Sequence, residues 1–158
     1  MKKKRFALIS VYNKKKIECI CDAFKKYNVQ IISTGSTANY IKKIGFKCFK
    51  VSDLTKFEEI LDGRVKTLHP LIHASLLFDR NNKKHINKFN NLNFPIIDFV
   101  IVNLYPFEEK AKKNKDNKHN IEMIDIGGPA LLRSAAKNYR SVTAICNTNQ
   151  YEEFITNM

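Results

Sequence analysis

Two segments of the chain gather the side chains that could do chemistry. Residues 63–70 read Gly-Arg-Val-Lys-Thr-Leu-His-Pro and hold two cations, a hydroxyl and an imidazole. Apolar segments flank this stretch and Pro70 fixes its exit, which predicts an ordered loop. Residues 124–138 place Asp125 just before Gly127-Gly128-Pro129, where glycines allow a ligand to approach the backbone and the proline suits a first helical turn. Asp125 is either a carboxylate that partners the helix start or a base with a tuned pKa.

Two shorter polar segments follow apolar runs. Residues 33–37 read Ser-Thr-Gly-Ser-Thr, and the N–H groups at a helix start, together with such hydroxyls, form an anion site. The same composition also suits an ordinary helix cap. Lys14 follows the first apolar run and would add a positive charge at the same edge. Tyr105, within residues 103–107, is either a phenol in the site or a core tyrosine with its hydroxyl at the rim.

The elements that must position these segments alternate along the chain. Apolar runs predict strands, and the i, i+3, i+4, i+7 spacing of Ile17, Ile20, Cys21 and Phe24 predicts a helix face. The predicted strands are 5–11, 29–32, 46–51, 96–104 and 141–146. The predicted helices are 14–27, 37–44, 150–156 and a short helix after Pro129 whose apolar face is Leu131, Leu132, Ala135 and Ala136. This order favours one α/β domain, a parallel sheet with helices on both faces and a site beyond the carboxyl ends of the strands. Residues 110–120 are charged and polar, which indicates a solvated loop or a helix end.

The composition narrows the class of protein. A chain of 158 residues is enough for one domain. The net charge of +13 comes mostly from lysine, with only five arginines, whereas nucleic-acid readout favours arginine. We therefore expect no nucleic-acid partner, although the field would favour a small anionic substrate. The apolar runs are too short for a membrane span or a signal peptide, so we expect no membrane partner and a cytoplasmic location. The four cysteines have neither zinc nor redox spacing and are interpreted as reduced structural thiols.

The polar segments also carry a family resemblance. Residues 7–11, 33–37, 63–70, 103–107 and 124–138, in this order, resemble the IMP cyclohydrolase domain of the bifunctional purine enzyme that also carries a formyltransferase. The resemblance covers nearly the whole chain and implies a methylglyoxal-synthase-like α/β/α sandwich. It implies ring closure of formylated aminoimidazole carboxamide ribonucleotide (FAICAR) to IMP and water, in which the carboxamide nitrogen attacks the formyl carbon. It also implies a homodimer, a purine ribonucleotide substrate, and neither a metal nor an organic cofactor.

The resemblance also implies the site residues. The substrate phosphate would sit at Lys14 and residues 33–37. Asp125 would accept from the attacking amide, Lys66 would donate to the formyl oxygen, and Tyr105 and Lys137 would shuttle the proton that lets water depart. The expected catalytic residues are thus Lys66, Tyr105, Asp125 and Lys137. The expected substrate contacts are Tyr12, Asn13, Lys14, Ser33, Thr34, Gly35, Ser36, Thr37, Arg64, Thr67, Asn103, Ile126 and Gly127.

Some positions depart from the family. Residues 12–16 read Tyr-Asn-Lys-Lys-Lys where the family usually has Ser-Asp-Lys-Thr-Gly, and Ser36 stands in place of a second glycine. The chain ends at Met158, so we expect residues 1–158 to be a cyclohydrolase domain incomplete at its C-terminus, without the transformylase domain, in a fragment or a shortened protein. Two alternatives stay open. One is a methylglyoxal synthase acting on a triose phosphate, and the other is a noncatalytic module that senses a nucleotide or phosphate.

Overall fold

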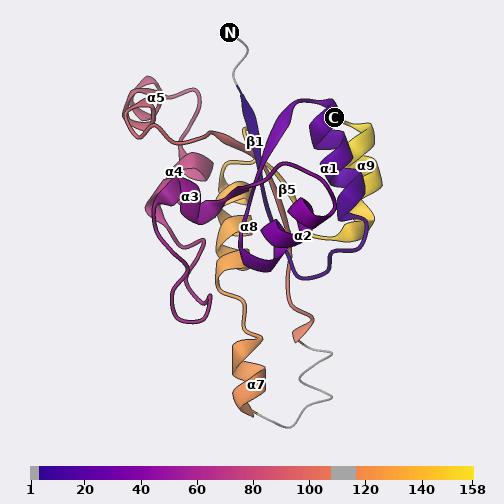
Figure 1. The fold of residues 1–158 in the computed structure, drawn as a ribbon. Coiled ribbons are helices and arrows are strands. Elements are labelled where there is room, and N and C mark those ends of the chain that lie inside the picture. The colour runs from indigo at the N-terminus through magenta and orange to yellow at the C-terminus, as the bar shows by residue number, and fades with distance from the viewer. Residues whose placement is uncertain (1–3, 108–116) are drawn as a thin grey trace.

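The sheet is the centre of the fold. The computed structural model of the protein describes residues 4–107 and 117–158 (Figure 1). Its five strands are all parallel, in the order β3-β2-β1-β4-β5. They are β1 (Arg5–Val11), β2 (Val29–Ser33), β3 (Phe49–Lys50), β4 (Ile97–Asn103) and β5 (Thr143–Ile145). The predicted α/β class with a parallel sheet is confirmed.

The strand order creates a crevice at one edge of the sheet. From β1 the chain moves to β2 and β3 on one side, and then crosses to β4 and β5 on the other. Ile9 lies opposite Ser33 of β2, and Val11 lies opposite Asn103 of β4, so the three strands end near one another. Helices that leave β1 and β4 on opposite faces open a crevice at this point, which is where parallel sheets bind ligands.

Helices cover both faces of the sheet (Figure 1). Adjacent residues of a strand point to opposite faces, so Ile9 packs with Phe24 of α1 while Leu8 packs in the cluster that contains Leu131 of α8. The first face carries α1 (Ile17–Lys26), α2 (Gly35–Lys43) and α9 (Tyr151–Thr156). The second face carries α3 (Val51–Thr55), α4 (Pro70–Leu77), α5 (Lys83–Asn90) and α8 (Gly127–Lys137). The other helices among the described residues are η1 (Thr148–Gln150) and α7 (Asn117–Glu122).

Several predicted boundaries are wrong. The strand predicted at 46–51 shrinks to Phe49–Lys50, because only these residues pair with β2 at the sheet edge and Val51 already begins α3. The strands predicted at 96–104 and 141–146 are also shorter, at Ile97–Asn103 and Thr143–Ile145. Helices α4 and α5 were not predicted. Of the stretch 110–120, residues 110–116 lie outside the described residues and 117–120 belong to α7.

The turn after β1 contains a left-handed residue, Lys16. The helix predicted from Lys14 begins at Ile17, after Lys16 with a φ of 60°. Such a left-handed backbone favours glycine, which the family that this chain resembles usually has at this position. The Lys16 ammonium lies 2.6 Å from the Glu152 carboxylate of α9, so the departure adds an ion pair between α1 and α9.

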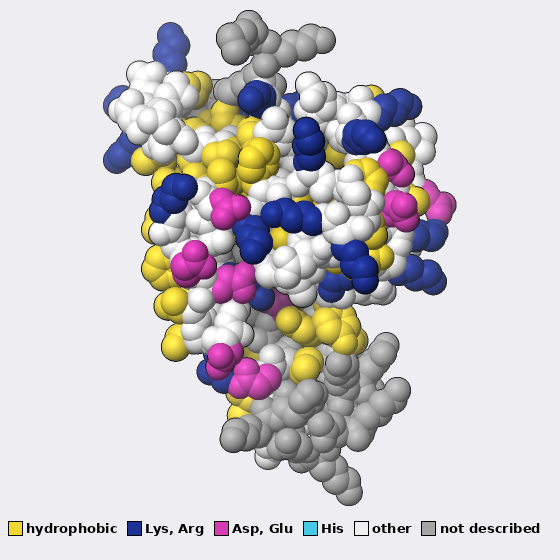
Figure 2. Space-filling view, in the orientation of Figure 1, with side chains coloured by type: hydrophobic (Ala, Val, Ile, Leu, Met, Phe, Trp, Pro, Cys, Tyr) yellow, Lys and Arg dark blue, Asp and Glu magenta, His cyan; other side chains and the backbone are white. Residues whose placement is uncertain are grey.

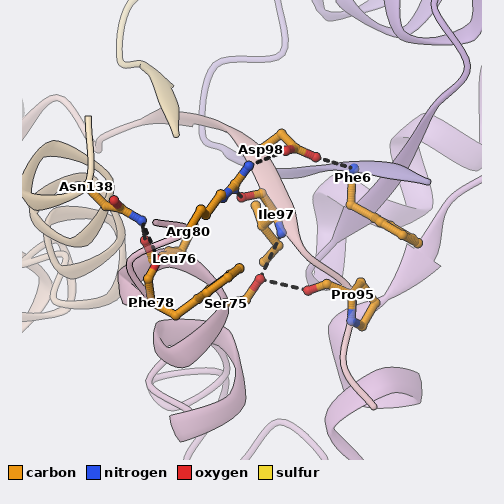
Figure 3. Close-up of polar contacts among 9 residues, drawn as sticks. All are labelled: Phe6, Ser75, Leu76, Phe78, Arg80, Pro95, Ile97, Asp98 and Asn138. Carbon is orange, nitrogen blue, oxygen red and sulfur yellow. Dashed lines mark hydrogen bonds and ion pairs between the residues drawn. The ribbon is translucent and has the colours of Figure 1, made fainter. Parts of the chain in front are cut away.

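A polar cluster anchors the end of α4 to β4 (Figure 3). Arg80 donates to the Asp98 carboxylate at 2.7 Å and to the Ile97 carbonyl at 2.8 Å, and Asp98 also accepts from the Phe6 N–H at 3.2 Å. Asn138, just after α8, donates to the carbonyls of Leu76 and Phe78. These bonds fix α4 and α8 relative to the sheet, and α4 and α8 adjoin two of the polar segments described above.

The cysteines are four free thiols. Cys21 is fully buried beside α9, and burial raises the pKa of its thiol to about 12. Burial also raises the pKa of Cys48 to about 11. Both thiols are therefore protonated at neutral pH. Within residues 4–107 and 117–158, no helix combines the length and apolar character that crossing a membrane requires.

Candidate functional site

A cavity of about 420 Å³ opens at the carboxyl ends of β1 and β4. This volume lies in the range of small-molecule sites. The cavity gathers thirteen of the seventeen predicted site residues, from five segments of the chain: Tyr12, Lys14, Thr34, Ser36, Thr37, Arg64, Lys66, Thr67, Asn103, Tyr105, Asp125, Ile126 and Gly127. Four predicted residues do not line it: Asn13, Ser33, Gly35 and Lys137.

The start of α2 forms one wall of the cavity. The buried Ser33 hydroxyl donates to the Ile9 carbonyl at 2.6 Å, and the Thr37 hydroxyl donates to the Val11 carbonyl at 3.0 Å. These hydroxyls hold β1 against β2 and α2, which explains why Ser33 is structural rather than exposed to a ligand. Within the described residues, the Thr34 side chain does not cap α2. The N–H groups of its first turn therefore keep their donor capacity for an anion.

Glu59 contacts this wall and was missed by the sequence analysis. Gly35 has a φ of +39°, and a Cβ placed there would lie 3.2 Å from the Glu59 carboxylate. The same carboxylate lies 3.5 Å from the Cβ position of Gly63. Glu59 thus packs between the polar turn of residues 33–37 and the loop that carries Arg64 and Lys66. Since this contact joins segments that are far apart in the chain, no local spacing signals it.

The side-chain amide at the end of β4 holds the turn that follows β1. The Asn103 side chain accepts from the Asn13 N–H at 2.8 Å and donates to the Asn13 carbonyl at 2.8 Å. Asn13 therefore shapes the turn without lining the cavity. The rings of Tyr12 and Tyr105 lie 4.9 Å apart, centroid to centroid, and both side chains are partly exposed. Tyr105 is thus a rim residue of the cavity and does not belong to the core.

The start of α8 forms the opposite wall. Asp125 accepts a hydrogen bond of 2.8 Å from the Gly128 N–H, so its carboxylate caps the helix. A Cβ on Gly128 would lie 2.6 Å from the other Asp125 oxygen, and one on Gly127 would lie 2.5 Å from the Thr67 hydroxyl. Both glycines are needed because Asp125 and the buried Thr67 lie so close to the helix start. Asp125 also lines the cavity, so its position suits both readings of its role.

Two histidines, His69 and His73, hold the loop of residues 63–70 in place. His69 caps α4 by accepting from the Leu71 N–H at 3.2 Å. His73 Nδ1 lies 2.9 Å from the Ser134 hydroxyl of α8. Burial lowers the pKa of His73, which favours its neutral form. The His69 imidazole is therefore a structural cap. The members of residues 63–70 that line the cavity are Gly63, Arg64, Lys66 and Thr67.

The charges that line the cavity balance in a protein of net charge +13. Among the described residues, three are cationic and three are acidic: Lys14, Arg64, Lys66, Asp62, Glu122 and Asp125. Figure 2 shows Asp and Glu side chains among the Lys and Arg side chains on the lower half of the face in view. Arg64 donates through two nitrogens to the two oxygens of Glu122, in α7, and this carboxylate raises the pKa of Arg64. Glu122 was not predicted, because α7 meets the loop only in the folded chain. Asp62, which directly precedes the loop, was not predicted either.

Lys137 lies away from the cavity. It occupies the last turn of α8, whereas Gly127 at the cavity begins the helix, about 15 Å away at 1.5 Å per residue. Lys137 borders a separate surface depression with Leu77, Arg133, Ser134 and Ala136. A single copy of the chain therefore brings together three of the four predicted catalytic residues, Lys66, Tyr105 and Asp125.

Comparisons with known proteins identify the family and agree with the fold. Residues 16–130 match the MGS-like domain, and the chain belongs to that family. It is 45% identical over 149 residues to the bifunctional purine biosynthesis protein PurH of Clostridium beijerinckii, covering 94% of this chain and 30% of that protein. It is 48% identical over 146 residues to PurH of Fusobacterium nucleatum, covering 92% and 29%. The chain thus spans about 30% of the length of these relatives. The crystal structure of ForH superposes with a TM-score of 0.84 at 25% identity, covering 97% of this chain and 78% of ForH.

Proposed function

We propose that this chain acts in purine biosynthesis as an IMP cyclohydrolase, which closes the ring of FAICAR to give IMP and water. The observation that carries the proposal is the gathering of thirteen predicted site residues in one cavity at the strand ends. The PurH relatives support the assignment to purine biosynthesis. The proposal extends to a purine ribonucleotide as the ligand and to a cytoplasmic location.

The two walls of the cavity suit the two ends of such a ligand. The N–H groups of α2 and the Lys14 ammonium would bind the 5′-phosphate. The ring would then reach toward Lys66 and Asp125 on the other side. Both reacting groups belong to one molecule, so the enzyme would gain mainly by holding the carboxamide nitrogen against the formyl carbon.

Three residues would carry the chemistry. Asp125 accepts a hydrogen bond and then a proton from the carboxamide nitrogen as it attacks the formyl carbon. The formyl oxygen gathers negative charge, and the Lys66 ammonium donates to it, an effect on the order of 10² to 10³ in rate. After Lys66 has protonated this oxygen once, Tyr105 at the rim relays the second proton with which it leaves as water. That second proton comes from the formylamino N–H, whose nitrogen forms the C=N bond of the new ring as the C–O bond breaks. No metal or organic cofactor takes part in this scheme.

Lys137 enters the scheme only through a second copy of the chain. Its place at the far end of α8 puts it outside the cavity of its own chain. In the homodimer that we propose, one copy would bring the end of its α8 to the cavity of the other. Lys137 would then share the proton relay with Tyr105.

A noncatalytic nucleotide-binding module is the second candidate. It is favoured by the Asp125 carboxylate, which already has a structural role as the cap of α8, and by the place of Lys137 outside the cavity. Such a module would bind the nucleotide at the same walls without closing its ring. A methylglyoxal synthase would also use the phosphate wall, with a triose phosphate in place of the nucleotide.

An ultraviolet assay of purine ring closure tests the proposal. Purified protein should convert FAICAR to IMP well above the uncatalysed rate. Lys66→Ala should lower kcat by about 10²-fold or more, whereas Lys88→Ala, an exposed lysine of α5, should leave it unchanged. Binding of IMP without ring closure would favour the sensing module. Formation of methylglyoxal from a triose phosphate would favour the synthase.

A further inference from the structure

Arg64 is the cation of the cavity whose charge is already compensated. Its guanidinium donates through Nε to Glu122 Oε2 at 3.2 Å and through a second nitrogen to Glu122 Oε1. This two-point contact fixes the plane of the guanidinium and occupies the edge that would otherwise receive a ligand carboxylate. Both side chains are about half exposed and both line the cavity, so the pair lies at its rim.

The two lysines that line the cavity, unlike Arg64, form no ion pair with a described carboxylate. Lys14 donates to the Tyr12 carbonyl at 3.5 Å, and no described carboxylate forms an ion pair with Lys14 or Lys66. The Asp62 carboxylate, by contrast, adds a second negative charge near Arg64. A carboxylate also lies near Lys66, since Glu59 Oε2 and Lys66 Nζ are 3.5 Å and 3.6 Å from the Cβ position of Gly63. Among the described residues, Arg64 is nevertheless the cavity cation that forms an ion pair, so its charge is compensated the most.

We propose that Glu122 is a specificity-determining residue that makes the ring end of the cavity prefer a neutral carboxamide to a carboxylate. The proposal rests on the proposed function, because it takes the phosphate to lie at Lys14 and the ring to reach toward Lys66 and Asp125. Arg64 lines the same cavity two residues before Lys66. A ligand carboxylate near Arg64 would meet the like charge of Glu122 and compete with it for the guanidinium. A carboxamide carries no charge and meets neither penalty.

Two ligands that differ only in the substituent at ring position 4 test the proposed preference. They are 5-aminoimidazole ribonucleotides with a 4-carboxamide or a 4-carboxylate, and neither carries the formyl group needed for ring closure. Calorimetry would give both dissociation constants for the wild type and for Glu122→Gln, which keeps the shape of the side chain and removes its charge. Glu122→Asp keeps the charge. The matched control is Glu152→Gln, which breaks the ion pair with Lys16, a pair that does not line the cavity.

The expected result is a change in preference rather than in overall binding. Wild-type protein and the Glu152→Gln and Glu122→Asp variants should bind the carboxamide more tightly than the carboxylate. Glu122→Gln should bind the carboxylate about fivefold more tightly than the wild type does, the upper range for an exposed ion pair, with less than about a twofold change for the carboxamide. Because screening weakens exposed charges, the gain should shrink at high salt.

Three results would overturn the inference. An unchanged preference in Glu122→Gln would do so while leaving ring closure by the wild type, and hence the proposed function, intact. An equal loss of preference in Glu122→Asp would show that the charge is not the cause. Failure of the wild type to bind either nucleotide would reject the inference together with the proposed function.

Discussion

Asp125→Asn separates the two roles of this carboxylate at the start of α8. Asparagine caps a helix about as well as aspartate, and its carbonyl oxygen can accept the Gly128 N–H that Asp125 now accepts at 2.8 Å. The variant loses only the favourable contact of a negative charge with the helix dipole, about 0.3 to 1 kcal/mol. For a chain of 158 residues this corresponds to a fall in Tm of about 1 to 4 °C.

The effect on ring closure should be much larger. If Asp125 accepts from the attacking carboxamide, removing its charge and basicity should lower the single-turnover rate by about 10²-fold or more. Thermal melts and single-turnover rates on the same preparations measure both quantities. Asp53→Asn is the matched control, because Asp53 accepts from the Lys50 N–H at the start of α3 and does not line the cavity.

Two outcomes would refute this reasoning. Equal single-turnover rates for wild type and Asp125→Asn would remove Asp125 from the mechanism and leave it as a helix cap. A fall in Tm of more than about 5 °C would show that asparagine does not replace the cap. The control should match the wild type in rate in either case.

Three further predictions follow from buried polar contacts. Thr37→Ala should raise KM more than it lowers kcat, as steady-state kinetics would show. It should also lower the free energy of unfolding by about 1 kcal/mol in urea melts, because the Thr37 hydroxyl donates to the Val11 carbonyl. Arg80→Met should leave Asp98 without its ion-pair partner and lower the free energy of unfolding by about 2 kcal/mol, a value discounted for partial exposure. Calorimetry should then show a Tm lower by about 4 to 8 °C, and an unchanged Tm would contradict the prediction. Burial lowers the pKa of His73, so this imidazole is protonated more readily in the unfolded chain than in the folded one. The free energy of unfolding should therefore fall as the pH decreases below about 6.5, and it should fall less steeply in His73→Gln.

The main elements of the fold could be predicted from the chain itself. The apolar run of β4 and the alternation of apolar runs with the face of α1 predicted a parallel sheet, because burial on both faces requires such runs. The polar segments after β1, β2 and β4 were predicted to share one edge, because parallel strands end on the same side of a sheet. They line one cavity in the structure.

Edges and irregular stretches could not be predicted in this way. The short β3 depends on pairing with β2. Apolar residues surround α4 on all sides, and the apolar face of the short α5 consists of Ile86 and Phe89 alone, so neither stretch was recognised as a helix. The left-handed Lys16 is another such case, since residue type alone disfavours the backbone that the turn requires.

The sequence by itself determined which side chains are available for chemistry and on which edge of the sheet most of them lie. Only the tertiary structure decided their partners. In the folded chain, Asp125 caps α8 and Arg64 pairs with Glu122 of α7. Glu59 packs between Gly35 and Gly63, and Lys137 lies at the end of α8 away from the cavity. The physical reason is that strand and helix periods are local, whereas hydrogen bonds and ion pairs between distant segments exist only once the sheet has brought those segments together.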